Sequence, residues 1–134
     1  MITRTARTLV LAALAAVALA ACSSNPAQAP AFDGSHVNAA SFALAVAEPS
    51  VTVLDVRTPA EFAEGHLPGA VNLDVEDASF PDKVAALDAG ADYAVYCRSG
   101  NRSKAAMDYM SQSGVTHTVG LTGGIGAWKG DLER

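Results

Sequence analysis

The apolar residues of this chain are grouped in short runs, and the spacing of these runs predicts the elements of the fold. Runs rich in β-branched and aromatic residues, which are typical of buried strands, occupy residues 51–56, 70–73, 93–96 and 115–119. Segments with helical character lie around them, at residues 39–47, 59–64, 81–87 and 103–111, and a last short helix runs through Trp128. Strands that alternate with helices predict an α/β fold, in which a mostly parallel central sheet carries helices on both faces.

The limits of one helix can be read from single residues. Thr58 precedes Pro59 and is followed three positions later by Glu61. This is the pattern of a capping box, in which the Thr and Glu side chains bond free backbone N–H groups of the first turn, and proline is favoured at the first helical position. Gly65 suits the end of the helix. We therefore expect a short helix that begins at Pro59 and ends before Gly65.

The first 21 residues have a different pattern from the rest of the chain. Arg4 and Arg7 lie in a segment without acidic residues, and an uninterrupted apolar run follows over residues 9–21. This run is shorter than the roughly 20 residues that a membrane-spanning helix needs. Basic residues before it and small residues at its end indicate a signal peptide.

The sequence LAAC at residues 19–22 resembles the lipobox of bacterial lipoproteins. The resemblance implies cleavage before Cys22, which would then carry the acyl chains; stable anchoring requires two or more chains. Residues 23–31 are polar and contain proline, which favours a tether that holds a domain away from a membrane. The alternative is a plain secretory leader that is followed by a cysteine by coincidence.

We therefore expect three parts in this 134-residue chain, whose length suits a single domain. Residues 1–21 form a cleaved lipoprotein signal peptide, residues 22–34 a lipidated cysteine with a flexible tether, and residues 35–134 one folded domain. The expected location is extracytoplasmic, with Cys22 attaching the protein to the periplasmic or cell-surface side of a bacterial membrane.

Charge and cysteine content exclude several classes of function. The net charge is −5, and it becomes −7 once Arg4 and Arg7 leave with the leader. An acidic domain argues against nucleic-acid binding, which depends on Lys and Arg side chains that neutralise phosphates. Two cysteines rule out a disulfide scaffold and a four-cysteine zinc site, and three scattered histidines offer no metal-ligand spacing. We expect no metal and no cofactor. With Cys22 acylated, Cys97 is the only free thiol.

Cys97 lies in the most informative segment of the chain, CRSGNRS at residues 97–103. It follows a predicted buried strand and precedes a predicted helix, and Gly100 and Asn101 between them tolerate left-handed backbone angles. A loop of this kind points successive backbone N–H groups inward and forms an anion-binding nest, to which the helix N-terminus adds positive potential. These groups, with Arg98 and Arg102, stabilise a thiolate. The alternative is a buried, inert thiol, but the polar loop around it is poor core material.

Three segments of the chain resemble the motifs of rhodanese domains. The sequence DVR at residues 55–57, with Glu61 and Phe62 and with GHLPGAVN at residues 65–72, resembles the first signature of that family. Residues 97–103 resemble its active-site loop, and Gly123, Gly124 and Trp128 resemble its C-terminal motif. The resemblance covers about residues 35–130 and implies the rhodanese fold.

The resemblance also implies a sulfurtransferase that transfers sulfane sulfur through a persulfide. Cys97 would attack thiosulfate or a similar donor, release sulfite, and pass the sulfur to cyanide or a thiol. The substrate-binding groups would be the backbone N–H groups of the loop, with the side chain of Arg102 and, in one alternative, that of Arg98. The loop comprises Arg98, Ser99, Gly100, Asn101, Arg102 and Ser103. Covalent catalysis in two half-reactions predicts ping-pong kinetics. A periplasmic or other extracytoplasmic acceptor protein is a possible partner.

Other polar residues of the motifs have simpler expected roles. Asp55 and Arg57 follow a buried strand, where charges must be paired or hydrogen-bonded, and in the family they are mainly architectural. The ring of His66 is expected to hydrogen-bond the backbone. Arg102 either faces the anion or pairs with an acid, and Arg98 either contacts the anion or only tunes the field around it.

Three rival functions use the same cysteine. A Cys-dependent phosphatase needs an arginine six positions after the cysteine, but Ser103 occupies that position and Arg102 comes one residue early. A persulfide carrier would receive its sulfur from a partner enzyme and turn over thiosulfate poorly. A thiol redox sensor would form a sulfenic acid at Cys97, but with Cys22 acylated no cysteine is left to resolve it.

Overall fold

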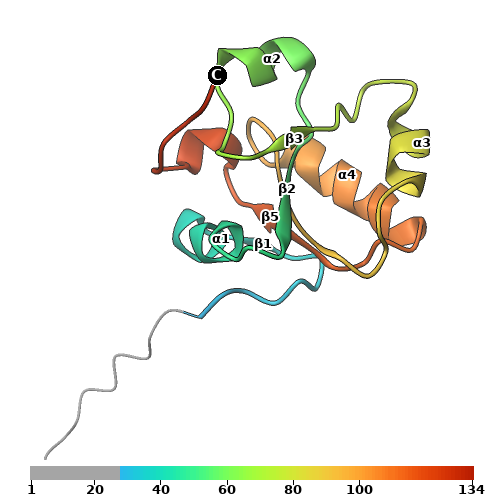
Figure 1. The fold of residues 1–134 in the computed structure, drawn as a ribbon, viewed down its shortest axis with the longest axis horizontal. Helices are drawn as coiled ribbons and strands as arrows, with labels where there is room; N and C mark the ends of the chain where they lie inside the picture. The colour runs from blue at the N-terminus through green and yellow to red at the C-terminus, as the bar shows by residue number, and fades with distance from the viewer. Residues whose placement is uncertain (1–27) are drawn as a thin grey trace, which may run out of the picture.

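The computed structural model describes residues 28–134, and within them five strands form a single parallel sheet (Figure 1). The strand order is β1-β5-β4-β2-β3, and each neighbouring pair is parallel. The strands are β1 (His36–Val37), β2 (Val51–Asp55), β3 (Val71–Asn72), β4 (Asp92–Tyr96) and β5 (Thr118–Leu121). The predicted α/β fold is confirmed.

Helices cover both faces of the sheet (Figure 1). They are α1 (Ala39–Val46), α2 (Pro59–Glu64), α3 (Phe80–Ala85), α4 (Asn101–Gln112) and a 3₁₀ turn η1 (Gly124–Ala127). On one face, α3 and α4 pack against the sheet, whereas α1 and η1 lie on the other. Successive residues of β4 enter opposite cores because side chains alternate along a strand. Ala94 faces α1, Val95 faces α4, and Cys97 lies on the α4 side.

Helix α2 has the limits that the sequence predicts. The Thr58 side chain accepts a hydrogen bond from the backbone N–H of Glu61, and the Glu61 carboxylate accepts one from the backbone N–H of Thr58. Pro59 is the first helical residue and Gly65 ends the helix. Both signals act between residues a few positions apart, so they do not depend on the rest of the fold.

Some predicted boundaries were wrong, and one strand was missed. Helix α4 begins at Asn101, not at residue 103, because Gly100 takes a left-handed backbone angle (φ +103°) and turns the chain directly into the helix. Strand β5 covers 118–121 instead of 115–119, since Val115 packs into the core beneath α4. Strand β1 was not predicted at all, because two residues are too few to show a period of two.

The carboxyl ends of β2 and β4 lie side by side in the sheet. After β2 the chain continues to β3 at one edge and then returns to β4 on the other side of β2. In open parallel sheets, ligand sites form outside the carboxyl ends of the strands at such a change of direction. Cys97, directly after β4, and Asp55, the last residue of β2, therefore occupy the region where a site is expected.

The leader, Cys22 and residues 23–27 of the predicted tether lie outside the described residues, so the lipoprotein signal peptide, the lipid anchor and the extracytoplasmic location stay predictions. Among residues 28–134, none of the helices has both the length and the apolar content required to cross a membrane.

Candidate functional site

The sulfur of Cys97 lies at the N-terminus of α4 and is held by the loop that leads into that helix. Cys97 is fully buried. The backbone N–H of Gly100 donates to Sγ at 3.1 Å, and Sγ lies 3.6 Å from Oγ of Ser103. Gly100 is the N-cap residue and supplies no side chain to the free N–H groups of the first turn of α4. These groups are therefore available to an anion, as the sequence predicts for a helix N-terminus.

The surroundings of Cys97 favour its thiolate. Burial alone raises the pKa of the thiol, because it disfavours the charged form. Hydrogen bonds from the backbone N–H and the hydroxyl of Ser103, and from the backbone N–H groups of Gly100 and Ser99, act in the opposite direction. The net effect is a pKa of Cys97 below that of an ordinary thiol, which is the property of a reactive cysteine.

Turn η1 packs directly on the loop of Cys97. The backbone N–H of Ile125 donates to the carbonyl oxygen of Cys97 at 2.8 Å. Gly124 has a left-handed backbone angle (φ +64°), and a Cβ atom at this position would collide with the backbone of Arg98. The glycine of the C-terminal motif thus permits a close approach of η1 to the loop that no side chain would allow.

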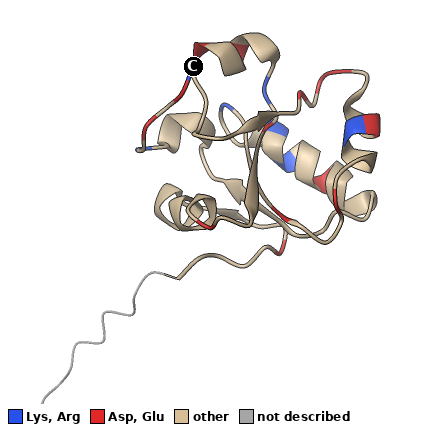
Figure 2. Ribbon diagram, in the orientation of Figure 1, with Lys and Arg blue, Asp and Glu red and all other residues tan. Residues whose placement is uncertain are grey.

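The structure gives Arg102 an acidic partner, which is one of the two roles that the sequence left open for it. Its guanidinium forms a two-pronged ion pair with Glu61 on α2, with both N–O distances 2.7 Å, and lies 3.5 Å from a carboxylate oxygen of Glu76. Figure 2 shows basic residues at the start of α4, with acidic residues on α2 and on the segment before α3. Arg102 therefore pairs with an acid and links α4 to α2.

We predict that Glu61→Gln lowers the free energy of unfolding by about 1 kcal/mol at neutral pH, as expected for an ion pair that is partly screened by solvent. Glutamine keeps the capping interaction but loses the charge that Arg102 binds. The bond to Arg102 lowers the pKa of Glu61 from 4.5 to about 2. A depressed carboxyl pKa stabilises the fold above the unfolded-state pKa, so the difference from wild type is present above about pH 4.5 and disappears as the pH falls towards 2.

Urea unfolding of both proteins between pH 2 and pH 7 measures this difference. Glu76→Gln is the matched control, because the Glu76 carboxylate is exposed and farther from Arg102. It should change the stability by no more than a few tenths of a kcal/mol. A pH-independent loss in Glu61→Gln would contradict the prediction.

The remaining loop residues have distinct positions. Arg98 and Ser99 are exposed, and among residues 28–134 Arg98 forms no ion pair. Asn101 is the exposed first residue of α4. The side chain of Arg98 lines a polar pocket of about 470 Å³ beside the loop, together with Arg57, Glu61, Glu64 and Ile125. Ser103 points inward, and its Oγ lies 3.0 Å from the carbonyl oxygen of Gly100.

Asp55 and Arg57 form a buried network beneath the site. The Arg57 guanidinium binds both carboxylate oxygens of Asp55, with a closest distance of 2.6 Å, and also donates to the carbonyl oxygen of Gly65. The hydroxyl of Tyr96 donates to Asp55 at 2.6 Å and accepts the backbone N–H of Leu67. Every charge is paired, and the network joins β2, β4 and the loop after α2.

His66 is held by the same loop. Nδ1 of its ring lies 3.0 Å from the carbonyl oxygen of Phe62, and the ring stacks on that of Phe62. The backbones of His66 and Glu133 exchange two hydrogen bonds, which tie the C-terminal segment to this loop. His66 therefore makes backbone and packing contacts, as its place in the turn suggests.

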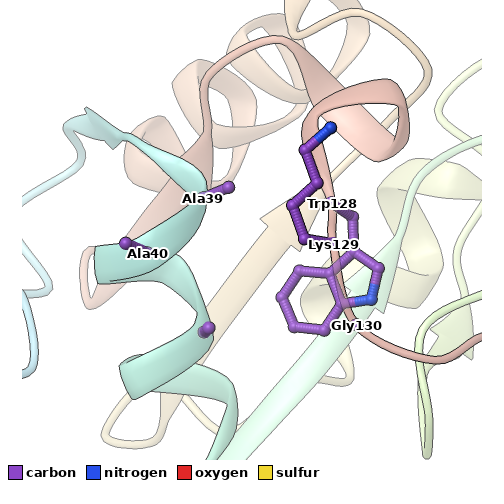
Figure 3. Close-up of a pocket in the computed structure, with 6 residues that line it drawn as sticks. Ala39, Ala40, Trp128, Lys129 and Gly130 are labelled. Carbon is purple, nitrogen blue, oxygen red and sulfur yellow. The ribbon is translucent and has the colours of Figure 1, made fainter.

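Trp128 does not belong to the site of Cys97. It packs against Phe42 on the α1 face of the sheet and lines an apolar pocket of about 310 Å³ (Figure 3). Figure 3 shows Ala39 and Ala40 on α1 opposite the indole ring. Within residues 28–134, no group of three or more His, Cys, Asp or Glu side chains is placed to hold a metal ion.

One residue of the site was missed by the sequence analysis. His36 on β1 places Nε2 3.0 Å from Oγ of Ser103. No local signal links these residues, which are 67 positions apart in the chain. Only the pairing of β1 with β5 brings His36 next to α4.

The fold and the site together define a class of protein. It is a parallel α/β domain that holds a buried cysteine of lowered pKa at the carboxyl edge of its sheet, in a loop whose N–H groups can bind an anion. This arrangement is suited to nucleophilic catalysis, since the thiolate is the reactive form and the loop can stabilise charge that develops on a substrate.

The chain belongs to the rhodanese-like domain family, whose pattern matches residues 38–131. A sulfurtransferase of Allochromatium vinosum is 40% identical over 78 residues, which cover 58% of this chain and 71% of that protein. The thiosulfate sulfurtransferase GlpE of Pseudomonas aeruginosa is 37% identical over 82 residues, which cover 61% and 73% of the two chains. The crystal structure of a rhodanese-related protein from Thermoplasma volcanium superimposes with a TM-score of 0.64 at 33% identity, and the match covers 73% of this chain and 96% of that one. The names of these relatives thus support a place for the chain in the rhodanese-type sulfurtransferase family.

Proposed function

We propose that this protein is a thiosulfate sulfurtransferase that carries sulfur as a persulfide on Cys97. The observation that carries the proposal is the position of Sγ, which is buried at the N-terminus of α4 and accepts the N–H of Gly100 at 3.1 Å. The loop can thus stabilise a thiolate and can bind the negative charge of a donor in the same place. The name of the Pseudomonas aeruginosa relative, a thiosulfate sulfurtransferase, supports thiosulfate as the donor.

The first half-reaction forms the persulfide. The Cys97 thiolate attacks the outer sulfur of thiosulfate, a bond forms between the two sulfur atoms, and the S–S bond of thiosulfate breaks. The electron pair of the broken bond leaves on sulfite. Three negative charges enter the step and three leave it, so no proton or further reactant is needed. The negative charge of the persulfide lies on its outer sulfur, which is bonded to Sγ. The N–H groups that surround Sγ belong to the loop next to this sulfur, and that loop can stabilise its charge.

The second half-reaction restores the enzyme. A nucleophilic acceptor, such as cyanide or a thiolate, attacks the outer sulfur of the persulfide. The bond between this sulfur and Sγ breaks, and its electron pair returns to Cys97 as a thiolate. The same N–H groups that lower the pKa of Cys97 stabilise this leaving group. Donor and acceptor thus react in turn, which predicts ping-pong kinetics.

The test is the intact mass of the purified protein after incubation with thiosulfate. The expected result is a gain of one sulfur atom, which disappears when cyanide is added and thiocyanate is released. Protein whose cysteines were first alkylated with iodoacetamide is the control and should gain nothing. If the protein gains no sulfur from thiosulfate but gains one from a partner enzyme, it is a persulfide carrier, and the proposal of a thiosulfate-using enzyme is wrong.

A further inference from the structure

A chain of three side chains connects the sulfur of Cys97 to β1. Nε2 of His36 lies 3.0 Å from Oγ of Ser103, and this oxygen lies 3.6 Å from Sγ of Cys97. Ser103 is fully buried. In the sulfur-transfer site described above, Ser103 is therefore the link through which a residue of the edge strand can act on the reactive sulfur.

The position of His36 is built into the sheet. His36 pairs with Gly120 in the register of β1 and β5. A Cβ atom on Gly120 would collide with the imidazole ring of His36. The missing side chain at position 120 therefore provides the space in which the ring lies against β5 and reaches α4.

The hydroxyl of Ser103 has one proton and several possible acceptors. They are Nε2 of His36, when it carries no proton, the carbonyl oxygen of Gly100 at 3.0 Å, and an ionised sulfur on Cys97. The Gly100 carbonyl already accepts the backbone N–H of Lys104 at 3.2 Å. If His36 donates an N–H to Oγ, it no longer competes for the proton, and the charged sulfur becomes the strongest acceptor that remains.

We propose that His36 is a positioning residue, whose Nε2–H donates to Oγ of Ser103 and so directs the hydroxyl proton of Ser103 to the sulfur of Cys97. The two hydrogen bonds run in one direction: His36 Nε2–H donates to Oγ of Ser103, and the Ser103 hydroxyl donates to the ionised sulfur of Cys97. This arrangement stabilises the thiolate of the free protein and, if the proposed function holds, the thiolate that leaves when the acceptor takes the outer sulfur.

The charged groups near His36 are consistent with a neutral ring. Burial lowers the pKa of His36 below its usual value, Lys104 on α4 lowers it further, and Asp108 on α4 raises it in part. Gly120 on β5 adds no side chain. A neutral ring has a single N–H, so the tautomer decides whether Nε2 donates or accepts. Protonation at low pH would keep Nε2 as a donor.

The variants His36→Leu and His36→Gln separate this role from simple packing. Leucine removes the donor, whereas the side-chain amide of glutamine can place an N–H near the position of Nε2. The readout is the pH dependence of Cys97 alkylation by iodoacetamide, followed by mass. We expect His36→Leu to raise the pKa of the thiol and to slow alkylation at pH 7 about tenfold, and His36→Gln to restore the rate to within about twofold of wild type.

The control is His117→Leu, which removes an exposed histidine that pairs with Asp92 and should leave the alkylation rate unchanged. The effect must also pass through Ser103: in a Ser103→Ala background, His36→Leu should cause no further slowing. Alkylation of His36→Leu at the wild-type rate would overturn the proposal, and so would an equal slowing in the Ser103→Ala background.

A measurement on the wild-type protein does not depend on how the variants fold. The ¹⁵N spectrum of the imidazole at neutral pH should show the proton of His36 on Nε2. An unprotonated Nε2 in the protein with ionised Cys97 would overturn the proposal. Neither readout uses thiosulfate, so a failure of the proposed function, seen as no sulfur uptake by the wild-type protein, is distinct from a failure of the role of His36.

Discussion

Replacing Cys97 by serine is expected to reduce the rate of sulfur transfer from thiosulfate to cyanide by about a thousandfold or more. The serine hydroxyl is similar in size and can accept the N–H of Gly100 that now reaches Sγ. It is not ionised at neutral pH, and oxygen cannot form the persulfide that the two half-reactions share. Loss of a covalent nucleophile in other enzymes costs activity on this scale. The rate of thiocyanate formation measures it.

The second cysteine of the chain provides the matched control. Cys22→Ser removes the predicted lipid-attachment residue and leaves Cys97 untouched, so the purified variant should transfer sulfur at the wild-type rate. The substitution adds no volume to the buried site, so we expect Cys97→Ser to keep the fold. Thermal unfolding of the variant measures this. A Cys97→Ser protein that keeps more than about a tenth of the wild-type rate would mean that the sulfur is not carried on this residue.

Replacing Gly124 by alanine should have the second-largest effect, because it disturbs both the fold and the loop of Cys97. The new Cβ would meet the backbone of Arg98, which cannot rotate away as a side chain can. The left-handed angle of Gly124 (φ +64°) adds strain of its own. We expect a loss of about 2 kcal/mol or more in the free energy of unfolding. In the protein that remains folded, alkylation of Cys97 should slow, because the N–H groups that surround Sγ are displaced.

Gly126 lies two residues further on in the same turn and serves as the matched control. A Cβ atom on Gly126 meets no other atom within 4 Å, and its backbone does not have the left-handed angle of Gly124. Gly126→Ala should therefore change neither the stability nor the alkylation rate by a measurable amount. Urea unfolding compares the two variants. If Gly124→Ala is as stable as Gly126→Ala, the contact between η1 and the loop is less close than the structure indicates.

The features that were predicted correctly are those in which the interacting residues are close together in the chain. The capping box of α2 joins Thr58 to Glu61, and the loop that cradles the sulfur closes between Cys97 and Gly100. In each case, the hydrogen bonds span three positions, so residue type and spacing are enough to predict them. The alternation of strands and helices has the same local origin, and it indicates the α/β class without any information on contacts across the sheet.

The contacts that were not predicted connect distant parts of the chain. Arg102 pairs with Glu61, 41 positions earlier, and the local sequence left open whether it faced an anion or an acid. The choice depends on the packing of α2 beside α4. His36 reaches Ser103 only because a two-residue strand joins the edge of the sheet. Two residues are too few to show the alternating pattern of a strand, and β1 is defined by its pairing with β5.

The same difference between contacts of chain neighbours and contacts of distant residues applies to the whole site. The residue types, their order and the turn at Gly100 follow from the chain itself, because backbone angles and helix ends are set by neighbouring residues. The sequence of residues 97–103 was therefore sufficient to predict a cysteine that is held by a tight loop at the N-terminus of a helix. The partners of its side chains depend on the strand order β1-β5-β4-β2-β3, which brings β1 and α2 to α4. Long-range pairing of this kind arises from burial of both faces of the sheet at once, and no local pattern in the sequence encodes it.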